Sequence, residues 1–123
     1  MSRIFPTVIF AAVWYLTTAQ LWAGEADVVD AKARCTQRVC TISAAVRHDD
    51  TGWDHYANHW RVLTPEGEEI ARRVLHHPHE NEQPFTRSLG QVRIPPGVDR
   101  VLIEAHDSVH DFGGQRFTLQ LPD

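Results

Sequence analysis

The sequence lacks the short motifs that identify common enzyme classes. It has no nucleophile elbow, no glycine-rich phosphate-binding loop and no metalloprotease helix motif. Ser108 lies beside Asp107 and near His106, but successive side chains of a strand point to opposite faces, so we infer no catalytic triad. Basic residues are also few, since 12 Lys and Arg against 16 Asp and Glu give a net charge of −4 and no basic stripe that could bind phosphates. We therefore expect neither an enzyme nor a nucleic-acid-binding protein.

An uncharged segment, residues 4–24, follows Arg3, and its apolar first part has the length of a signal-peptide core. We assign residues 1–23 to a signal peptide, with cleavage after Ala26 as the alternative. The remaining single domain, residues 24–123, would carry a net charge of about −5 and be periplasmic or secreted. The other interpretation is a retained N-terminal membrane anchor, because the segment approaches the length of a membrane-spanning helix. A membrane is a partner only in that case.

The chain has two cysteines, Cys35 and Cys40, and a single methionine, Met1. In an exported protein a disulfide between the two cysteines is the expected state, and it would close a tight hairpin. So small a ring stabilises a fold by about 2 kcal/mol in the chain-entropy model. Neither cysteine adjoins the expected cleavage sites, so a lipid-anchored N-terminus is not indicated. The mature chain also offers no soft sulfur ligands for copper(I).

Apolar and polar residues alternate along the chain after the signal segment, which is typical of β-strands. Val101, Ile103 and Ala105, for example, would share one face of a strand. Turn sequences such as Pro65–Gly67 separate the alternating segments. Seven strands are expected, over residues 28–34, 40–47, 56–64, 69–75, 85–94 with a bulge at Gly90, 101–106 and 117–121.

Residues 66–75 also admit an amphipathic helix. Glutamates at the start and arginines at the end suit the helix dipole, and Ile70, Val74 and Leu75 would line one side. The seven-strand pattern as a whole resembles an antiparallel sandwich of the immunoglobulin or fibronectin type III kind, with Trp60 where a central strand would bury an indole. The expected class is therefore an all-β sandwich. This resemblance concerns architecture and implies no function.

All eight histidines lie between His48 and His110. Successive loops of such a sandwich alternate between its two ends. The loops expected at the histidine-bearing end are residues 48–55, 76–84 and 107–114. The opposite end would hold the Cys35–Cys40 hairpin and no histidine, so we place function at the histidine-bearing end.

Neutral imidazole is a common ligand of divalent metals, and three histidines occur within residues 76–79. With neighbouring carboxylates they would form a nitrogen and oxygen shell that suits zinc, copper(II) or nickel. The first-choice ligands are His77, His79, His106 and His110, and the second group is His76, His48, His55, His59 and Asp107. Neither His77 nor His79 is expected in the core. No pair has the fixed spacing of a strong zinc motif, so solvated loop histidines are the competing interpretation.

A second hypothesis is a non-catalytic module that recognises an exported protein or a ligand through the same loops. Trp53, Tyr56 and Phe112 would supply its aromatic contacts. Histidines in an acidic surrounding would also make such binding sensitive to pH. The sequence thus predicts a metal ion or an exported protein as the partner of this end.

Overall fold

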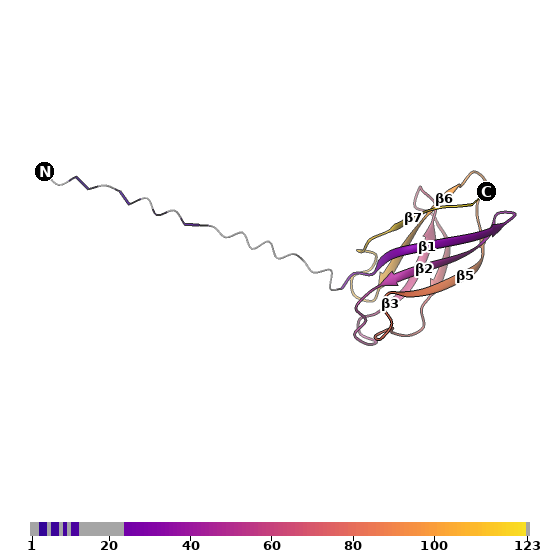
Figure 1. Ribbon diagram of the computed structural model, residues 1–123, viewed down its shortest axis with the longest axis horizontal. Helices are drawn as coiled ribbons and strands as arrows, with labels where there is room; N and C mark the ends of the chain where they lie inside the picture. Colours follow the sequence, from indigo (N-terminus) through magenta and orange to yellow (C-terminus); the bar gives the residue numbers. More distant parts are fainter. Residues whose placement is uncertain (1–2, 5, 8, 10, 13–23, 123) are drawn as a thin grey trace.

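The computed structural model describes residues 3–4, 6–7, 9, 11–12 and 24–122. The predicted signal peptide therefore lies largely outside the described residues, none of which form a helix that is long and apolar enough to cross a membrane. The strands are β1 (Asp27–Thr36), β2 (Val39–Arg47), β3 (Ala57–Leu63), β4 (Glu69–Val74), β5 (Phe85–Arg93), β6 (Arg100–Asp107) and β7 (Phe117–Gln120). They form two antiparallel sheets with the orders β1-β2-β5 and β4-β3-β6-β7 (Figure 1).

The all-β prediction is confirmed, and each of the seven expected segments overlaps one strand, with β1, β2 and β6 extending beyond the expected bounds. The helix considered for residues 66–75 is wrong, because β4 occupies residues 69–74 and pairs with β3. The bulge expected at Gly90 is present. Gly90 and Gln91 together oppose the single residue Thr41, and the positive φ of 58° falls on Gln91.

The core lies between the sheets, where the alternating apolar residues meet. Trp60 of β3 is fully buried, as predicted, and Ile42 of β2 and Ile103 of β6 are equally inaccessible. Burial of each such side chain stabilises the fold by roughly 1.5–3 kcal/mol. The outward-facing residues of β3 and β6 pair across the strands, for example Arg61 with the buried Glu104 at 2.6 Å between Nε and Oε1.

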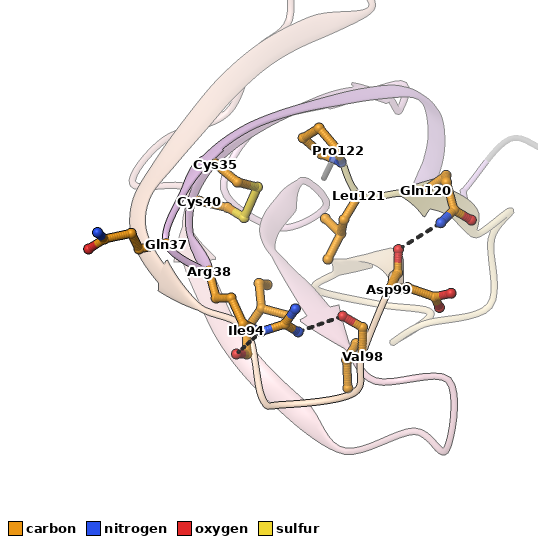
Figure 2. Close-up of a pocket in the computed structure, with 10 residues that line it drawn as sticks. All are labelled: Cys35, Gln37, Arg38, Cys40, Ile94, Val98, Asp99, Gln120, Leu121 and Pro122. Atoms are coloured by element: carbon orange, nitrogen blue, oxygen red, sulfur yellow. Dashed lines mark hydrogen bonds between the residues drawn. A yellow bond between two sulfur atoms is a disulfide. The ribbon is translucent and has the colours of Figure 1, made fainter.

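The predicted disulfide between Cys35 and Cys40 is confirmed, and these residues face each other across the β1–β2 hairpin. Gln37 and Arg38 form its two-residue turn, with φ values of 51° and 63°. Two positive φ values give the turn the twist that a tight hairpin requires. The Arg38 guanidinium also donates hydrogen bonds to the carbonyls of Pro95 (2.6 Å) and Val98 (2.7 Å). These bonds join the hairpin to the β5–β6 turn, and Figure 2 shows the one to Val98.

A pocket of about 220 Å³ lies at the same end, beside the disulfide (Figure 2). None of the residues that line this pocket is a histidine. The lining residues are Cys35, Gln37, Arg38, Cys40, Ile94, Val98, Asp99, Gln120, Leu121 and Pro122. The histidines lie instead on the other three loops and the adjoining strand ends. The two ends of the molecule therefore differ in chemistry.

The start of β1 and the residue before it are attached to the β6–β7 loop. The backbone N–H of Val28 donates to the Gln115 carbonyl (2.9 Å), and the Gln115 N–H donates to Asp27 Oδ1 (2.6 Å). The backbones approach so closely that a Cβ on Gly114 would lie 1.9 Å from the Ala26 carbonyl oxygen. Only glycine fits there, and the attachment brings Gly24 to the histidine-bearing end.

Candidate metal centre

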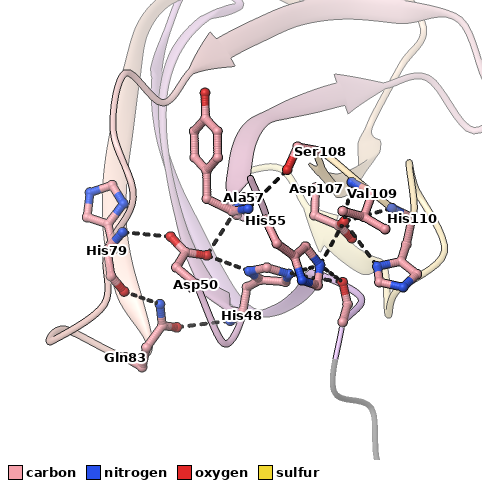
Figure 3. A network of polar contacts seen from close by, with 12 residues as sticks. His48, Asp50, His55, Ala57, His79, Gln83, Asp107, Ser108, Val109 and His110 are labelled. Carbon is pink, nitrogen blue, oxygen red and sulfur yellow. Dashed lines mark hydrogen bonds and ion pairs between the residues drawn. The ribbon is translucent and has the colours of Figure 1, made fainter. Parts of the chain in front are cut away.

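Three side chains, two from the β2–β3 loop and one from the end of β6, converge at the histidine-bearing end (Figure 3). His48 follows β2, His55 precedes β3, and Asp107 is the last residue of β6. One donor atom from each lies within 4.8 Å of the other two, and within residues 24–122 this is the single such group of three histidine, cysteine or acidic residues. Its members come together because the loops after β2 and β6 meet at one end of the sandwich.

The buried carboxylate of Asp50 orients His48. Nδ1 of His48 donates to Asp50 Oδ1, which also accepts the Ala57 N–H at 3.0 Å, while Oδ2 accepts the His79 N–H at 2.6 Å (Figure 3). Burial acts to raise the pKa of Asp50, but these hydrogen bonds outweigh it and lower the pKa below its usual value. Asp50 is therefore ionised, and its hold on Nδ1 leaves Nε2 of His48 directed into the site.

Gln83 joins the loop after β4 to the same arrangement. Its Oε1 accepts the N–H of His48 at 2.9 Å, and its Nε2 donates to the His79 carbonyl at 2.8 Å. Two loops that are distant in sequence are thus fixed around one imidazole. This support keeps the His48 ring in place without a metal ion.

The backbone carbonyl of Gly24 lies between the two histidine rings. It accepts hydrogen bonds from Nε2 of His48 (2.9 Å) and Nε2 of His55 (3.0 Å). Burial acts to lower the pKa of His48, but the bonds to Asp50 and Gly24 outweigh it and raise that pKa above its ordinary value. A proton on each Nε2 therefore occupies the space where a metal ion would bind.

Asp107 is fully buried, and its two oxygens have different surroundings. Oδ1 accepts the backbone N–H groups of Val109 (2.9 Å) and His110 (2.7 Å) and lies 3.2 Å from His55 Nε2. Oδ2 has no hydrogen-bond partner among the described residues. A buried carboxylate oxygen without a partner is costly, and a cation would satisfy it. The ring of His110 lies beside the group, with Nδ1 at 3.1 Å from Oδ1.

His79 and His77 form a separate pair on the loop after β4, with ring centroids 4.5 Å apart. The expectation that neither lies in the core is wrong for His79, which is 6% exposed and stacks on Phe85 at 4.0 Å. Burial, followed by the nearby charge of Arg87, lowers its pKa below the ordinary value. His77 and His76 are exposed. His79 therefore serves as a packing residue on the sheet.

His106 and His59 form a third arrangement on the outer face of the four-stranded sheet. They are register partners on β6 and β3, and their rings stack at 4.3 Å. Phe112 packs edge-on against both rings, with the Arg61 guanidinium 3.9 Å from its centroid. Burial first, and then the neighbouring His106, lower the pKa of His59 to about 4. Phe112 is thus occupied by intramolecular contacts.

The four first-choice ligands are divided among these three arrangements. His77 and His79 lie together, His106 stacks on His59, and His110 contacts Asp107. The converging group consists entirely of residues from the second group: His48, His55 and Asp107. Sequence reasoning missed Gly24, Asp50 and Gln83. Asp50 had a signal of its own, since its position two residues after His48 suits a carboxylate partner for Nδ1.

Of the residues predicted to form a recognition surface, Trp53 is the most accessible. It is 66% exposed and packs edge-on against Tyr56, with ring centroids 5.6 Å apart. Val109, on the loop after β6, is 56% exposed. Apolar surface is therefore presented next to the converging group.

The comparisons with known proteins give one relative. A protein named "Putative lipoprotein" from Halomicrobium mukohataei is 39% identical to this chain over 103 residues. The match covers 83% of this chain and 50% of that protein, so the chain spans about half the length of the curated relative. No protein-family model matches the chain, and no solved structure matches it.

Proposed function

We propose that this chain is an exported, non-catalytic protein that binds a divalent transition metal, namely zinc, copper(II) or nickel. The observation that carries the proposal is the convergence of donor atoms of His48, His55 and Asp107 within 4.8 Å. The other carboxylate oxygen of Asp107, Oδ2, is buried and has no partner among the described residues. Imidazole nitrogen and carboxylate oxygen are ligands that these metals accept. The hydrogen bond from His48 Nδ1 to Asp50 supplies the outer carboxylate that metal-binding histidines usually have.

The spacing of the donor atoms supports the same conclusion. Metal–nitrogen and metal–oxygen bonds of about 2.0–2.1 Å place neighbouring ligands of a tetrahedral ion roughly 3.3 Å apart. His48 Nε2 and His55 Nε2 are 3.3 Å apart, and His55 Nε2 is 3.2 Å from Asp107 Oδ1. An ion could therefore replace the protons between these atoms without a large movement of the rings.

Export is supported by two observations of different kinds. The N-terminal segment has the pattern of a signal peptide, and the relative from Halomicrobium mukohataei is named as a lipoprotein. We propose a periplasmic or secreted location, with an N-terminal anchor as the alternative. The strand orders β1-β2-β5 and β4-β3-β6-β7 support an immunoglobulin or fibronectin type III-like sandwich for the exported domain.

The test is metal analysis of untagged protein purified without a metal resin, followed by calorimetric titration with zinc, copper(II) and nickel. We expect one tightly bound ion per chain and a loss of at least tenfold in affinity in His55→Ala, whose half-buried ring makes it less disruptive than a change at His48. His77→Ala, an exposed histidine of the same end, is the matched control and should bind as the parent does. Protein that takes up no metal at micromolar concentration would overturn the proposal.

Exposed apolar residues favour a second candidate, a module that recognises an exported protein partner. Trp53 and Val109 are both more than half exposed beside the histidine loops. Aromatic side chains exposed in this way are typical anchors of interfaces. Under this hypothesis Trp53→Ala would abolish partner binding and leave metal affinity unchanged, and the nearby histidines would make that binding depend on pH.

A further inference from the structure

A donor that is not a side chain, the backbone carbonyl of Gly24, lies beside the converging group. We propose that Gly24 is a metal ligand, and that removal of the signal peptide after Ala23 completes the site by providing the free α-amine of Gly24 as an additional donor. This inference rests on the proposed metal-binding function. It adds a regulated step to that function, because the unprocessed chain would lack one ligand.

The position of the Gly24 carbonyl is the first argument. Its oxygen lies 2.9 Å from His48 Nε2 and 3.0 Å from His55 Nε2. With bonds of about 2.1 Å, neighbouring ligands lie roughly 3.4 Å apart around a tetrahedral ion and roughly 3.0 Å apart around an ion with more ligands. Adding the Gly24 carbonyl would thus raise the coordination number above four. The carbonyl therefore occupies the place of a ligand beside both rings.

The second argument is that the backbone at position 24 favours glycine. Gly24 is buried and has a φ of 147°, and a Cβ added to it would lie 2.3 Å from Cε1 of His110. The glycine allows the backbone itself to reach the histidines, which is a common use of this residue where a chain approaches a ligand closely. A larger residue would be strained at this φ and would displace the ring of His110.

The α-amine follows from covalent geometry. The nitrogen and the carbonyl oxygen of one residue are three bonds apart and within about 3.6 Å of each other, so both can bind one ion in a five-membered chelate ring. In the uncleaved chain this nitrogen is a planar amide whose lone pair is delocalised and does not bind metals at neutral pH. Cleavage turns it into an amine with a pKa near 8, which donates its lone pair to the metal while its proton passes to water.

The structure also distinguishes the two expected cleavage points. Gly24 and Ala26 are both buried, and the Gly24 carbonyl is bonded to both rings. Cleavage after Ala26 would remove these contacts and one metal ligand. Cleavage after Ala23 keeps them and exposes the amine at the site, so the mature chain begins at Gly24.

The experiment uses the full chain, exported by its own leader, in a Lys32→Arg background. Lys32 is the sole lysine of the sequence and is exposed on β1, so the exported variant has its α-amine as the single primary amine. Mass spectrometry gives the N-terminus, and half of the protein is then acetylated. Copper(II) affinity is measured against a competing chelator for both halves, with thermal unfolding as the check that acetylation leaves the fold intact.

We expect an N-terminus at Gly24, an affinity at least tenfold weaker after acetylation, and one fewer nitrogen ligand in the copper(II) paramagnetic resonance spectrum. Equal affinity and an unchanged spectrum after acetylation would overturn this inference, as would a mature chain that begins at Asp27. In either case copper(II) binding that requires His55 would leave the proposed function standing. If neither half binds copper(II), zinc or nickel, the proposed function itself fails.

Discussion

Asp50 accepts a hydrogen bond from Nδ1 of His48, and both side chains are completely inaccessible to solvent. The contact sets which nitrogen of His48 faces Gly24 and His55. It also couples the site to the loop after β4, because Asp50 receives the N–H of His79 as well. The orientation of one imidazole thus depends on residues from three parts of the chain.

Asp50→Asn is expected to weaken metal binding by about 10- to 100-fold, the usual effect of changing an outer-shell partner of a metal ligand. The amide has the shape of the carboxylate but lacks the charge that holds Nδ1–H and raises the basicity of the ring. Titration calorimetry measures the change. Asp49→Asn is the matched control, since Asp49 is the exposed neighbour. Equal affinities of the two variants would contradict the role given to Asp50.

Metal affinity is expected to fall as the pH is lowered from 8 to 6. The raised pKa of His48 means that a proton competes with the ion at Nε2 in this range. Binding should therefore release protons, which calorimetry detects as a dependence of the apparent enthalpy on the ionisation enthalpy of the buffer. Affinity that does not change with pH would argue against His48 as a ligand.

The free energy of unfolding is expected to decrease as the pH is lowered, because of His59. Its folded pKa of about 4 lies below the ordinary 6.5, so the unfolded chain binds more protons between these values and stability decreases as the pH falls from about 6.5 to 4. The contribution is about 2 kcal/mol, after allowance for the partial exposure of the ring. Denaturant unfolding of the parent and His59→Gln at pH 7 and pH 4.5 measures it. If the parent and His59→Gln lose the same free energy of unfolding between pH 7 and pH 4.5, groups other than His59 cause the loss.

Replacing Cys35 and Cys40 together with serine is expected to lower the free energy of unfolding by about 2 kcal/mol, because a small covalent ring is lost from the unfolded chain. Metal affinity should not change, since the disulfide lies at the end opposite the histidines. Urea unfolding and metal titration of the same variant test both statements. A large change in metal affinity would show that the two ends are coupled.

The strands were predictable because each depends on a local pattern. Alternation at Val101, Ile103 and Ala105 and a turn at Pro65–Gly67 are properties of neighbouring residues, and the structure has strands and a turn at those places. The helix considered for residues 66–75 rested on end charges and one apolar side, which contribute less than the pairing of β4 with β3. The disulfide was likewise a local feature.

The candidate metal centre was predictable as a region but not as a set of residues. The sandwich order gathers the histidines at one end, but which ring meets which depends on tertiary contacts. Clustering in the sequence favoured His77 and His79, whereas packing on Phe85 withdraws His79 from the group. Asp50 resembled an ordinary turn residue, and nothing local shows that it is buried under His48. A backbone carbonyl such as that of Gly24 has no sequence signature.

Gly114 lies on the β6–β7 loop, far along the chain from Gly24, yet it determines how the first residues of the domain pack on that loop. Because a Cβ there would collide with the Ala26 carbonyl, any larger residue at this position would lift the first residues of the domain off the loop. Gly24 would move with them, away from His48 and His55. Substitution of Gly114, which contacts none of the proposed ligands, would then disrupt the candidate metal centre, while the strands of both sheets kept their pairing.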